Sequence, residues 1–368
     1  MNKLIFGNLV HRPLRSVISV FAVAIEVVMI LSIAAVMFGI LNGSRRQTTG
    51  IGMDMLAHPG AATALMNTSA ASADIRIADV LRKLPHVEVV APVNIKLTTG
   101  AAIENIYGID YSSYNTLRPF VFLSGGPFQQ PFDMIIDDLQ AASGKGLRVG
   151  DTVKALSHDF RVCGIVEHGK GSRKFIRLDT MDQLDGNPGK AAEFFLKTEN
   201  QPQFQEDVRK EILSTPGLED WSVQTIQEFL STLTPERMPG FNIALRVVIG
   251  IAIVIGFLVI FQSMYTAVME RTREIGILKS MGAGRGSIVS VVLRETGLLA
   301  VVGVALGVGA TYLLRSLLHA RFPTLSFQIT PEWVSSAVLI ALIGALLGAL
   351  YPAFKAARKD PIDALSYE

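Results

Sequence analysis

The sequence predicts an integral membrane protein with four transmembrane helices and an extracytoplasmic α+β domain inserted between the first and second helices. Of its 368 residues, 49% are hydrophobic and only 18% are charged, whereas about a quarter of the residues in a typical soluble domain are charged. Four apolar runs are each long enough to cross a bilayer of roughly 30 Å. Between the first two runs, short alternating segments separated by Gly, Pro, Asn, Asp and Ser are typical of a folded α+β domain.

The first apolar run is interpreted as an uncleaved helix. Residues 1–16 carry basic residues and no acid, and Val17–Leu41 follows with a single charge. A signal peptide would have an apolar region of only about 7–15 residues before its cleavage site. We therefore predict a cytoplasmic segment over residues 1–16 and a first transmembrane helix over residues 17–41.

The inserted domain is predicted to occupy residues 42–240. Apolar residues at helical spacing predict these helices: Asp74–Leu84, Phe204–Leu213 and Thr225–Leu233. Alternating patterns between turn residues predict these strands: Val87–Val90, Ile103–Tyr107, Met134–Ile136, Thr152–Leu156, Phe160–Val166, Phe175–Leu178 and Glu193–Leu196.

Three segments of this domain need separate interpretation. His158-Asp159 is expected to form the turn of a hairpin. Residues 43–72 are poor in charge. They are expected to form a loosely structured continuation of the first helix, a mobile flap, or a plain linker. The basic loop Gly169–Lys174 would contact an anionic lipid or partner, or would be an ordinary solvated turn.

Three further apolar runs predict the remaining transmembrane helices: Phe241–Val268, Ile288–Leu318 and residues 333–353. They leave a segment 269–287, a short loop 319–332 and a tail 354–368. Basic residues favour the cytoplasmic side of a membrane, and they cluster in the amino-terminal segment, in segment 269–287 and in the tail. We therefore place these three parts and both termini in the cytoplasm, and loop 319–332 with the inserted domain outside.

Composition and spacing argue against several other functions. A formal net charge of +2 and no basic tract give no indication of nucleic-acid binding. The single cysteine, Cys163, lies in a predicted strand and is expected to be a buried structural thiol. The histidines of the inserted domain lack ligand spacing, and no nucleophile elbow is present. We predict no metal, no bound cofactor and no catalytic residues in this chain.

The stretch between the second and third helices, Met269–Ala283, is dense in charge and must lie outside hydrocarbon. A helix here would display Glu270, Arg271 and Glu274 on one face, and Ile275, Leu278 and Met281 as an apolar stripe on another. Gly276 would cost such a helix about 1 kcal/mol relative to Ala, which indicates close approach by another surface. The alternative is a solvated loop that carries positive-inside charges.

Several stretches resemble one family of membrane proteins. Glu270–Ala283, with Glu295 following, resembles the signature of the FtsX/MacB-type permeases of ABC transporters. The amino-terminal Asn8–Arg15 and the ending Tyr351–Glu368 are similar to the opening and the ending of that family. Within the inserted domain, Tyr107–Asp110, and Gly150–Val153 together with Phe160–Val166, resemble the MacB-like periplasmic core domain.

The resemblance implies that segment 269–287 is a coupling helix that docks on a cytoplasmic ATPase and transmits its closure to the inserted domain (mechanotransmission). By similarity the contact would include the following residues: Glu270, Arg271, Arg273, Glu274, Ile275, Gly276, Leu278, Lys279, Gly282, Asp360 and Pro361. No Gly-x4-Gly-Lys-Ser/Thr motif is present in the sequence, so a nucleotide cradle of P-loop type is missing. ATP and Mg²⁺ are therefore expected on a separate partner chain.

Polar and small residues inside the apolar runs are the remaining candidates. Glu26 lies deep in the first helix, where a carboxylate is costly and a functional candidate. It is expected to be protonated, to face a wet dimer seam, or to be a neutral acid hydrogen-bonded to a neighbouring helix. Two small-xxx-small motifs are expected to bring the third and fourth helices together, with generic glycine enrichment as the alternative: Gly303/Gly307 and Gly344/Gly348.

The sequence and the resemblance together predict the permease subunit of an ABC transporter in a bacterial inner membrane. It would export or extract an apolar or amphipathic substrate, such as a lipid, lipoprotein, peptide or drug. The expected partners are a cytoplasmic ATPase, a second permease (identical or a sister chain), membrane lipid and, in a trans-envelope pump, a periplasmic adaptor. The alternative is an FtsX-like regulator that activates a cell-wall hydrolase or signalling partner; a membrane-bound enzyme lacks a catalytic constellation.

Overall fold

The computed structural model describes residues 13–60, 72–99, 103–143, 146–186, 188–199, 202–234, 237 and 241–359. These residues form two compact units. We call the first, which contains residues 1–39, 240–318 and 327–368, the helical unit, and the second, which contains Ile40–Pro239 and His319–Ser326, the β domain.

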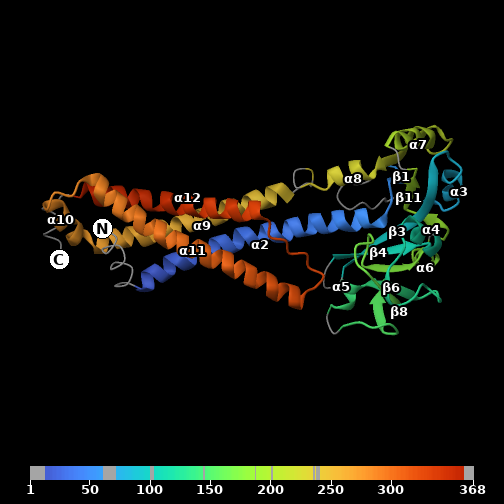
Figure 1. The fold of residues 1–368 in the computed structure, drawn as a ribbon, viewed down its shortest axis with the longest axis horizontal. Helices are drawn as coiled ribbons and strands as arrows, with labels where there is room; N and C mark the ends of the chain where they lie inside the picture. Colours follow the sequence, from blue (N-terminus) through green and yellow to red (C-terminus); the bar gives the residue numbers. More distant parts are fainter. Residues whose placement is uncertain are drawn as a thin grey trace. The chain divides into compact units, whose positions relative to one another are not determined.

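Four long helices make up most of the helical unit (Figure 1): α2 (Pro13–Ile51), α9 (Phe241–Glu270), α11 (Arg285–Arg321) and α12 (Pro331–Arg358). All four are long and apolar enough to cross a membrane, judged by length and composition within the described residues. Their buried side chains form one cluster that includes Val27, Ile260, Ala300 and Ala341. This arrangement confirms four apolar helices with an α+β domain inserted after the first of them.

The small-residue motifs pack differently from the prediction. A Cβ at Gly303 would lie 2.7 Å from Val23 Cβ, and one at Gly307 would lie 2.7 Å from the Ala24 carbonyl oxygen, so α11 uses this stripe to approach α2. A Cβ at Gly348 would lie 2.9 Å from the Phe257 carbonyl oxygen on α9. The predicted approach of the third and fourth helices through these motifs is therefore wrong. Sequence showed which faces were small but not which helices they meet.

The β domain is built on a mixed sheet with the strand order β12-β1-β11-β3-β4-β9-β6-β8-β5, and β7 pairs with β8. Its strands are β1 (Met55–Pro59), β3 (Val87–Thr99), β4 (Ile103–Ile109), β5 (Phe122–Gly125), β6 (Asp133–Asp137), β7 (Thr152–Ala155), β8 (His158–Val166), β9 (Lys174–Arg177), β11 (Glu193–Thr198) and β12 (Trp221–Thr225). The β4–β9 and β6–β8 pairs are parallel. A separate small sheet pairs β10 (Lys190–Ala191) with β2 (Ala73–Asp74).

Helices cover this sheet and complete its cores. They are α3 (Ile77–Leu81), α4 (Tyr111–Leu117), α5 (Asp138–Ala141), α6 (Leu178–Leu184), α7 (Pro202–Ser214) and α8 (Ile226–Thr232). One core lies among β1, β11 and α7 and contains Phe194, Val208 and Trp221. A second core is rich in aromatic side chains such as Tyr114 and Phe175. A third joins β6, β8 and α6.

The structure corrects several boundaries in this domain. The first helix continues without a break to Ile51, so the loose continuation or linker predicted for residues 43–72 is a regular helix up to that point. The helix predicted over Asp74–Leu84 is shorter in the structure and forms only α3. Its predicted start lies in β2, where Ala73 and Asp74 pair with β10. Strands β1, β5 and β12 and helices α4, α5 and α6 were not predicted.

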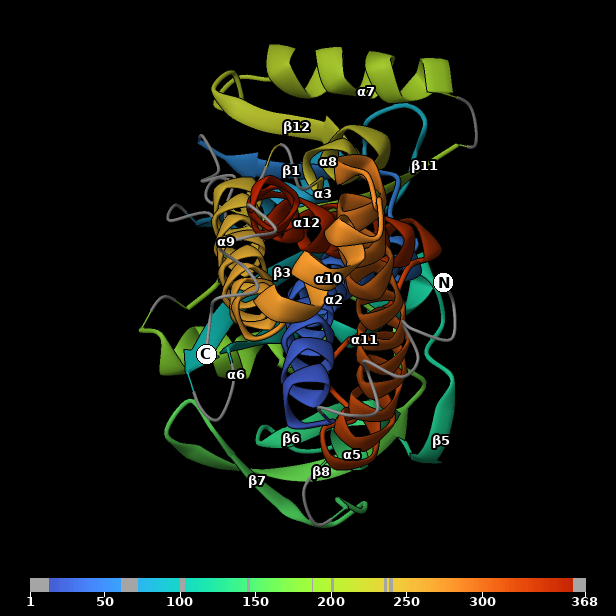
Figure 2. The same ribbon diagram turned by 90° about the vertical axis from the view of Figure 1, so that its left-hand side faces the viewer.

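The hairpin turn also lies two residues earlier than predicted. Strands β7 and β8 run side by side (Figure 2). Ala155 pairs with His158, so the two-residue loop between them is Leu156-Ser157. Both loop residues have positive φ, 48° and 64°, as a type I′ turn requires. Because neither residue is Gly or Asn, the usual sequence signal for this turn was missing.

Candidate functional site

The charged segment after α9 folds as a separate short helix, α10 (Thr272–Ser280). Arg271 leaves helical geometry with φ −105° and separates it from α9. At the other end, Gly282 adopts φ +94°, while its N–H donates to the Lys279 carbonyl and the Ala283 N–H donates to the Leu278 carbonyl. This pattern is a Schellman cap, for which glycine is the favoured residue. Gly282 therefore has a structural reason to be present.

Arg271 is held inside the helical unit rather than on an outer face. Its Nη1 lies 3.1 Å from Glu295 Oε2 on α11, and the two side chains are only 12% and 5% exposed. Removing one member of a buried ion pair would leave the other charge buried without a partner, which is strongly destabilising. Each group therefore depends on the other. The predicted charged docking face of Glu270, Arg271 and Glu274 is wrong in this respect, because Arg271 turns inward to α11.

Lys279 forms a second anchor. Its Nζ donates to the Ala357 carbonyl at 3.1 Å and also to the Lys359 carbonyl. These carbonyls stand at the end of α12, where a helix lacks internal donors. Lys279 therefore ties α10 to α12 in the way that Arg271 ties it to α11. Asp360 and Pro361, predicted to lie beside α10, are outside the described residues.

The apolar stripe predicted for α10 is divided between two surroundings. Ile275 packs against a small cluster formed by Val268, Ile288 and two alanines of α12, and Thr272 and Gly276 are buried. Met281, by contrast, is 72% exposed, and Ile277, which the sequence analysis did not select, is 45% exposed. Arg273 and Glu274 are also exposed. The outward surface of α10, defined by Arg273, Glu274, Ile277 and Met281, is thus mixed in polarity.

A cavity of about 500 Å³ lies between the end of α9, α10 and the start of α11. Its walls are mostly apolar and include Leu278, Val291 and Val292. The Arg271–Glu295 pair also lines it. Leu278, predicted as part of the docking stripe, therefore faces this cavity, and Glu274 and Ile277 of the outward surface stand at its border.

Glu26 lies inside the helical unit and is 4% exposed. Gly256 on α9 leaves room for it, since a Cβ there would lie 1.9 Å from Glu26 Oε2. Gly344 on α12 is also near, with a would-be Cβ 3.8 Å from Oε1. Oε1 has no hydrogen-bond partner among the described residues. For this oxygen, the predicted hydrogen bond to a neighbouring helix is absent from the described part of the chain.

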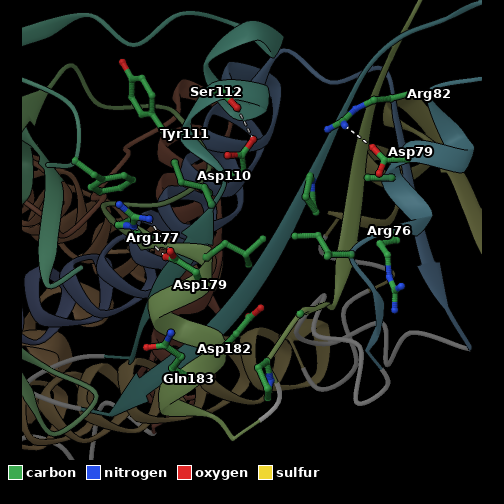
Figure 3. Close-up of a pocket in the computed structure, with 18 residues that line it drawn as sticks. Arg76, Asp79, Arg82, Asp110, Tyr111, Ser112, Arg177, Asp179, Asp182 and Gln183 are labelled. Carbon is green, nitrogen blue, oxygen red and sulfur yellow. Dashed lines mark hydrogen bonds and ion pairs between the residues drawn. The ribbon is translucent and has the colours of Figure 1, made fainter. Parts of the chain in front are cut away.

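The β domain contains a cavity of about 690 Å³ bordered by α3, α4 and α6 (Figure 3). Ion pairs stand on its two sides: Arg82–Asp79 at 2.8 Å and Arg177–Asp179 at 2.6 Å. Asp182, which is nearly fully buried, accepts a hydrogen bond from Asn94. Burial raises the pKa of Asp182 to about 6.

This cavity has no signature in the sequence, because its charged residues come from three separate segments with no recognisable spacing. Each of its arginines is paired with an aspartate within the domain. Among the described residues, no group of three or more His, Cys, Asp and Glu side chains could hold a metal ion.

Comparison with known proteins places the chain in a family. Residues 16–210 match the MacB-like periplasmic core domain, and residues 246–361 match the FtsX-like permease C-terminal domain. The first match covers most of α2 and most of the β domain, and the second covers the remaining helices with α10. Together they identify an ABC-transporter permease of the FtsX/MacB type. The chain belongs to this family.

Individual proteins are similar to parts of this chain. An uncharacterized ABC transporter permease of Methanocaldococcus jannaschii is 27% identical over 60% of this chain and 58% of its own length. The macrolide export ATP-binding/permease protein MacB of Chromobacterium violaceum is 33% identical over 41% of this chain and 23% of its own length. The periplasmic region of MacB from Actinobacillus actinomycetemcomitans is 17% identical over 50% of this chain and 94% of that structure, with a TM-score of 0.39. The match to this chain thus spans between about a quarter and 58% of the length of these two curated relatives.

Proposed function

We propose that this chain is the permease subunit of an ABC complex in which a separate cytoplasmic ATPase docks on α10. ATP hydrolysis would move the β domain and drive export or extraction of an apolar or amphipathic substrate. The observation that supports this proposal most is the outward surface of α10. It presents two apolar side chains one helical turn apart, Ile277 and Met281, beside Arg273 and Glu274.

The anchors behind this surface explain how a nine-residue helix could carry force. A helix of this length is marginal alone, yet α10 is fixed to α11 through Arg271–Glu295 and to α12 through Lys279. A push on α10 would therefore reach two long helices at once. The roles of the segment divide accordingly: Arg271, Ile275, Gly276 and Lys279 hold the helix, and the outward surface meets the partner.

The docking test uses a variant that leaves the anchors intact. Ile277→Asp with Met281→Asp should prevent an ABC ATPase from copurifying with the tagged full chain from its own host. ATP hydrolysis by the purified complex should fall to background. The matched control is Val80→Asp with Val149→Asp, two exposed apolar residues of the β domain, which should leave both readouts unchanged. An undiminished, active complex with the α10 variant would refute the docking surface.

A charge reversal at Arg271 would be an unsuitable probe of docking, because it would also break the buried pair with Glu295. Arg273→Glu alone is the appropriate substitution, since Arg273 is exposed. It should weaken the complex without lowering the thermal stability of the permease. The two effects are separated by size-exclusion chromatography and a melting curve.

The proposed orientation puts both termini and α10 in the cytoplasm and the β domain outside. Met281→Cys and Lys154→Cys, each introduced alone in a Cys163→Ser background, would report it. A membrane-impermeant maleimide should label Lys154→Cys in whole spheroplasts and Met281→Cys only after lysis. Labelling of both positions in intact spheroplasts would contradict the orientation.

Transport and regulation are distinguished by what stimulates ATP hydrolysis. We expect stimulation by an amphipathic substrate in nanodiscs, with a second permease in the complex. Stimulation only by a cell-wall hydrolase would instead indicate the FtsX-like regulator.

A further inference from the structure

The loop that precedes β9, residues Gly169–Arg173, is neither solvated nor free to meet a partner. Lys170 is buried, and its Nζ donates to the Arg118 carbonyl at 2.8 Å. Its own carbonyl accepts a hydrogen bond from Tyr114 at 2.6 Å, and Ser172 Oγ donates to the Asn105 carbonyl at 2.7 Å. Both readings of this loop given by the sequence, a solvated turn or a lipid contact, are therefore wrong.

This loop lies directly against the last turn of α2. A Cβ at Gly50 would lie 1.6 Å from the Gly169 carbonyl oxygen, and a Cβ at Gly171 would lie 2.9 Å from Ile51. At Gly50 the two backbones touch, and at Gly171 the loop backbone packs against the side chains of Ile51 and Tyr107. Because α2 runs without a break from Pro13 to Ile51, the first membrane helix ends on this loop.

The same loop reaches the connection between α11 and α12, whose residues His319–Ser326 belong to the β domain. Arg173 Nη2 donates to the Thr324 carbonyl at 2.9 Å. The connection also lies near α2, since a Cβ at Gly43 would lie 3.7 Å from Ser326 Cβ. The end of α2 and the α11–α12 connection are thus continuous with long apolar helices, whereas the loop that they contact leads into β9.

Arg173 is also joined to the sheet. Its carbonyl accepts the Asp137 N–H at 2.9 Å, and its Nη1 lies 3.8 Å from Asp137 Oδ2. Asp137 ends β6 and caps α5, accepting the Gln140 N–H at 2.6 Å. Arg173 thus links the α11–α12 connection to β6 and, through the next residue, to β9.

We propose that Arg173 is a positioning residue that fastens the α11–α12 connection to the sheet of the β domain, so that displacement of the connection is carried into β6 and β9. The movement rests on the proposed function, whereas the fastening can be measured without it. A guanidinium suits this task, because it can hold a carbonyl and face a carboxylate at once. Its hydrogen bond to the connection uses a main-chain acceptor, so the identity of residue 324 should not matter.

The fastening is tested by hydrogen exchange of the full chain in nanodiscs, in a Cys163→Ser background without nucleotide. Arg173→Ala should speed exchange of the amides of residues 322–326 by about ten-fold or more, as expected for loss of a hydrogen bond from a charged donor. Thr324→Ala keeps the accepting carbonyl and should exchange like the parent. An unchanged rate in Arg173→Ala would overturn the proposal.

A disulfide provides a rescue that a merely destabilised fold would not show. Cβ atoms about 3.7 Å apart suit a disulfide, so Gly43→Cys with Ser326→Cys fastens the connection to α2 independently of Arg173. In Arg173→Ala, the oxidised bridge should restore slow exchange at the connection, and reduction should abolish it. Fast exchange in the oxidised form would mean that the faster amide exchange of Arg173→Ala does not come from release of the connection. That result would overturn the proposal.

The carried movement is tested in the complex with its ATPase. Arg173→Ala should keep the ATPase bound and hydrolysing ATP but lose the nucleotide-dependent change in exchange at β6 and β9. A full nucleotide response in this variant would overturn the carrying role. If no ATPase binds the unsubstituted chain, the proposed function fails instead. The hydrogen-exchange experiment without nucleotide still tests whether Arg173 fastens the connection.

Discussion

A buried carboxylic acid should make the β domain less stable as the pH rises. Glu193 begins β11, is 1% exposed, and its Oε2 has no hydrogen-bond partner among the described residues. Burial raises the pKa of Glu193 from 4.5 to about 8. Because the folded state holds this proton more tightly than the unfolded chain does, stability is greatest below pH 4.5 and falls until about pH 8.

The size of this effect follows from the two pKa values. The difference between 4.5 and about 8 sets a ceiling of about 5 kcal/mol, at about 1.4 kcal/mol per unit. Between pH 5.5 and pH 8 the expected loss from Glu193 is about 3 kcal/mol. For a domain of this size each kcal/mol shifts the melting temperature by about 2–4 °C, so Glu193 should lower it by about 6–12 °C across that range.

The assay follows thermal unfolding of the full chain in detergent through Trp221, which packs against Phe194 in the β domain. A Trp333→Phe background removes the other tryptophan. Glu193→Gln keeps the shape and removes the titration, so its melting temperature should fall much less between pH 5.5 and pH 8.

Some pH dependence should remain in Glu193→Gln, because burial also raises the pKa values of Asp137 and Asp182 to about 6. The control is Glu88→Gln on the neighbouring strand β3, an exposed carboxylate that should leave the curve unchanged. If Glu193→Gln loses as many degrees as the parent chain over the same interval, the reasoning from burial is refuted.

Three further predictions concern the helical unit. Arg271→Ala and Glu295→Ala should each destabilise it by about 3–5 kcal/mol, as expected when one member of a buried pair is removed. The double variant should lose less stability than the sum of the two single losses. Additive losses in the melting curves would contradict the pairing. Gly256→Ala should prevent normal packing because its Cβ would meet Glu26 Oε2, and Glu26→Ala should relieve the defect in the double variant, measured as monodisperse yield after purification. Gly282→Ala should lower the stability by about 1–2 kcal/mol, because an L-residue is strained in the left-handed region and φ is +94° at this position. A melting temperature equal to that of the parent chain would argue against the cap.

Sequence patterning succeeded where a single local property decides the outcome. The four apolar runs could only be long helices, since a membrane leaves no water to satisfy other backbone conformations. The core strands β3, β4, β6 and β8 were found, with shifted ends, because alternation and turn residues agreed. Strand β1 was missed, because its buried run Met55–Pro59 lies in a stretch rich in Gly, Ala and Met that resembles a linker, although Gly52, with φ +84°, and Asp54 precede it.

The sequence by itself determined the membrane class, the inserted domain and the charged break between the second and third apolar runs, because hydropathy and charge are properties of contiguous residues. Whether that break is a helix or a solvated loop was left open. Only the tertiary structure decided what those charges do. Arg271 turned inward because α11 places Glu295 beside it, and the basic loop was buried because α2 ends on it. The glycine motifs contact α2 and α9 rather than each other. A small residue in the sequence indicates close approach by another segment, but only the packing of the helices decides which helix that is.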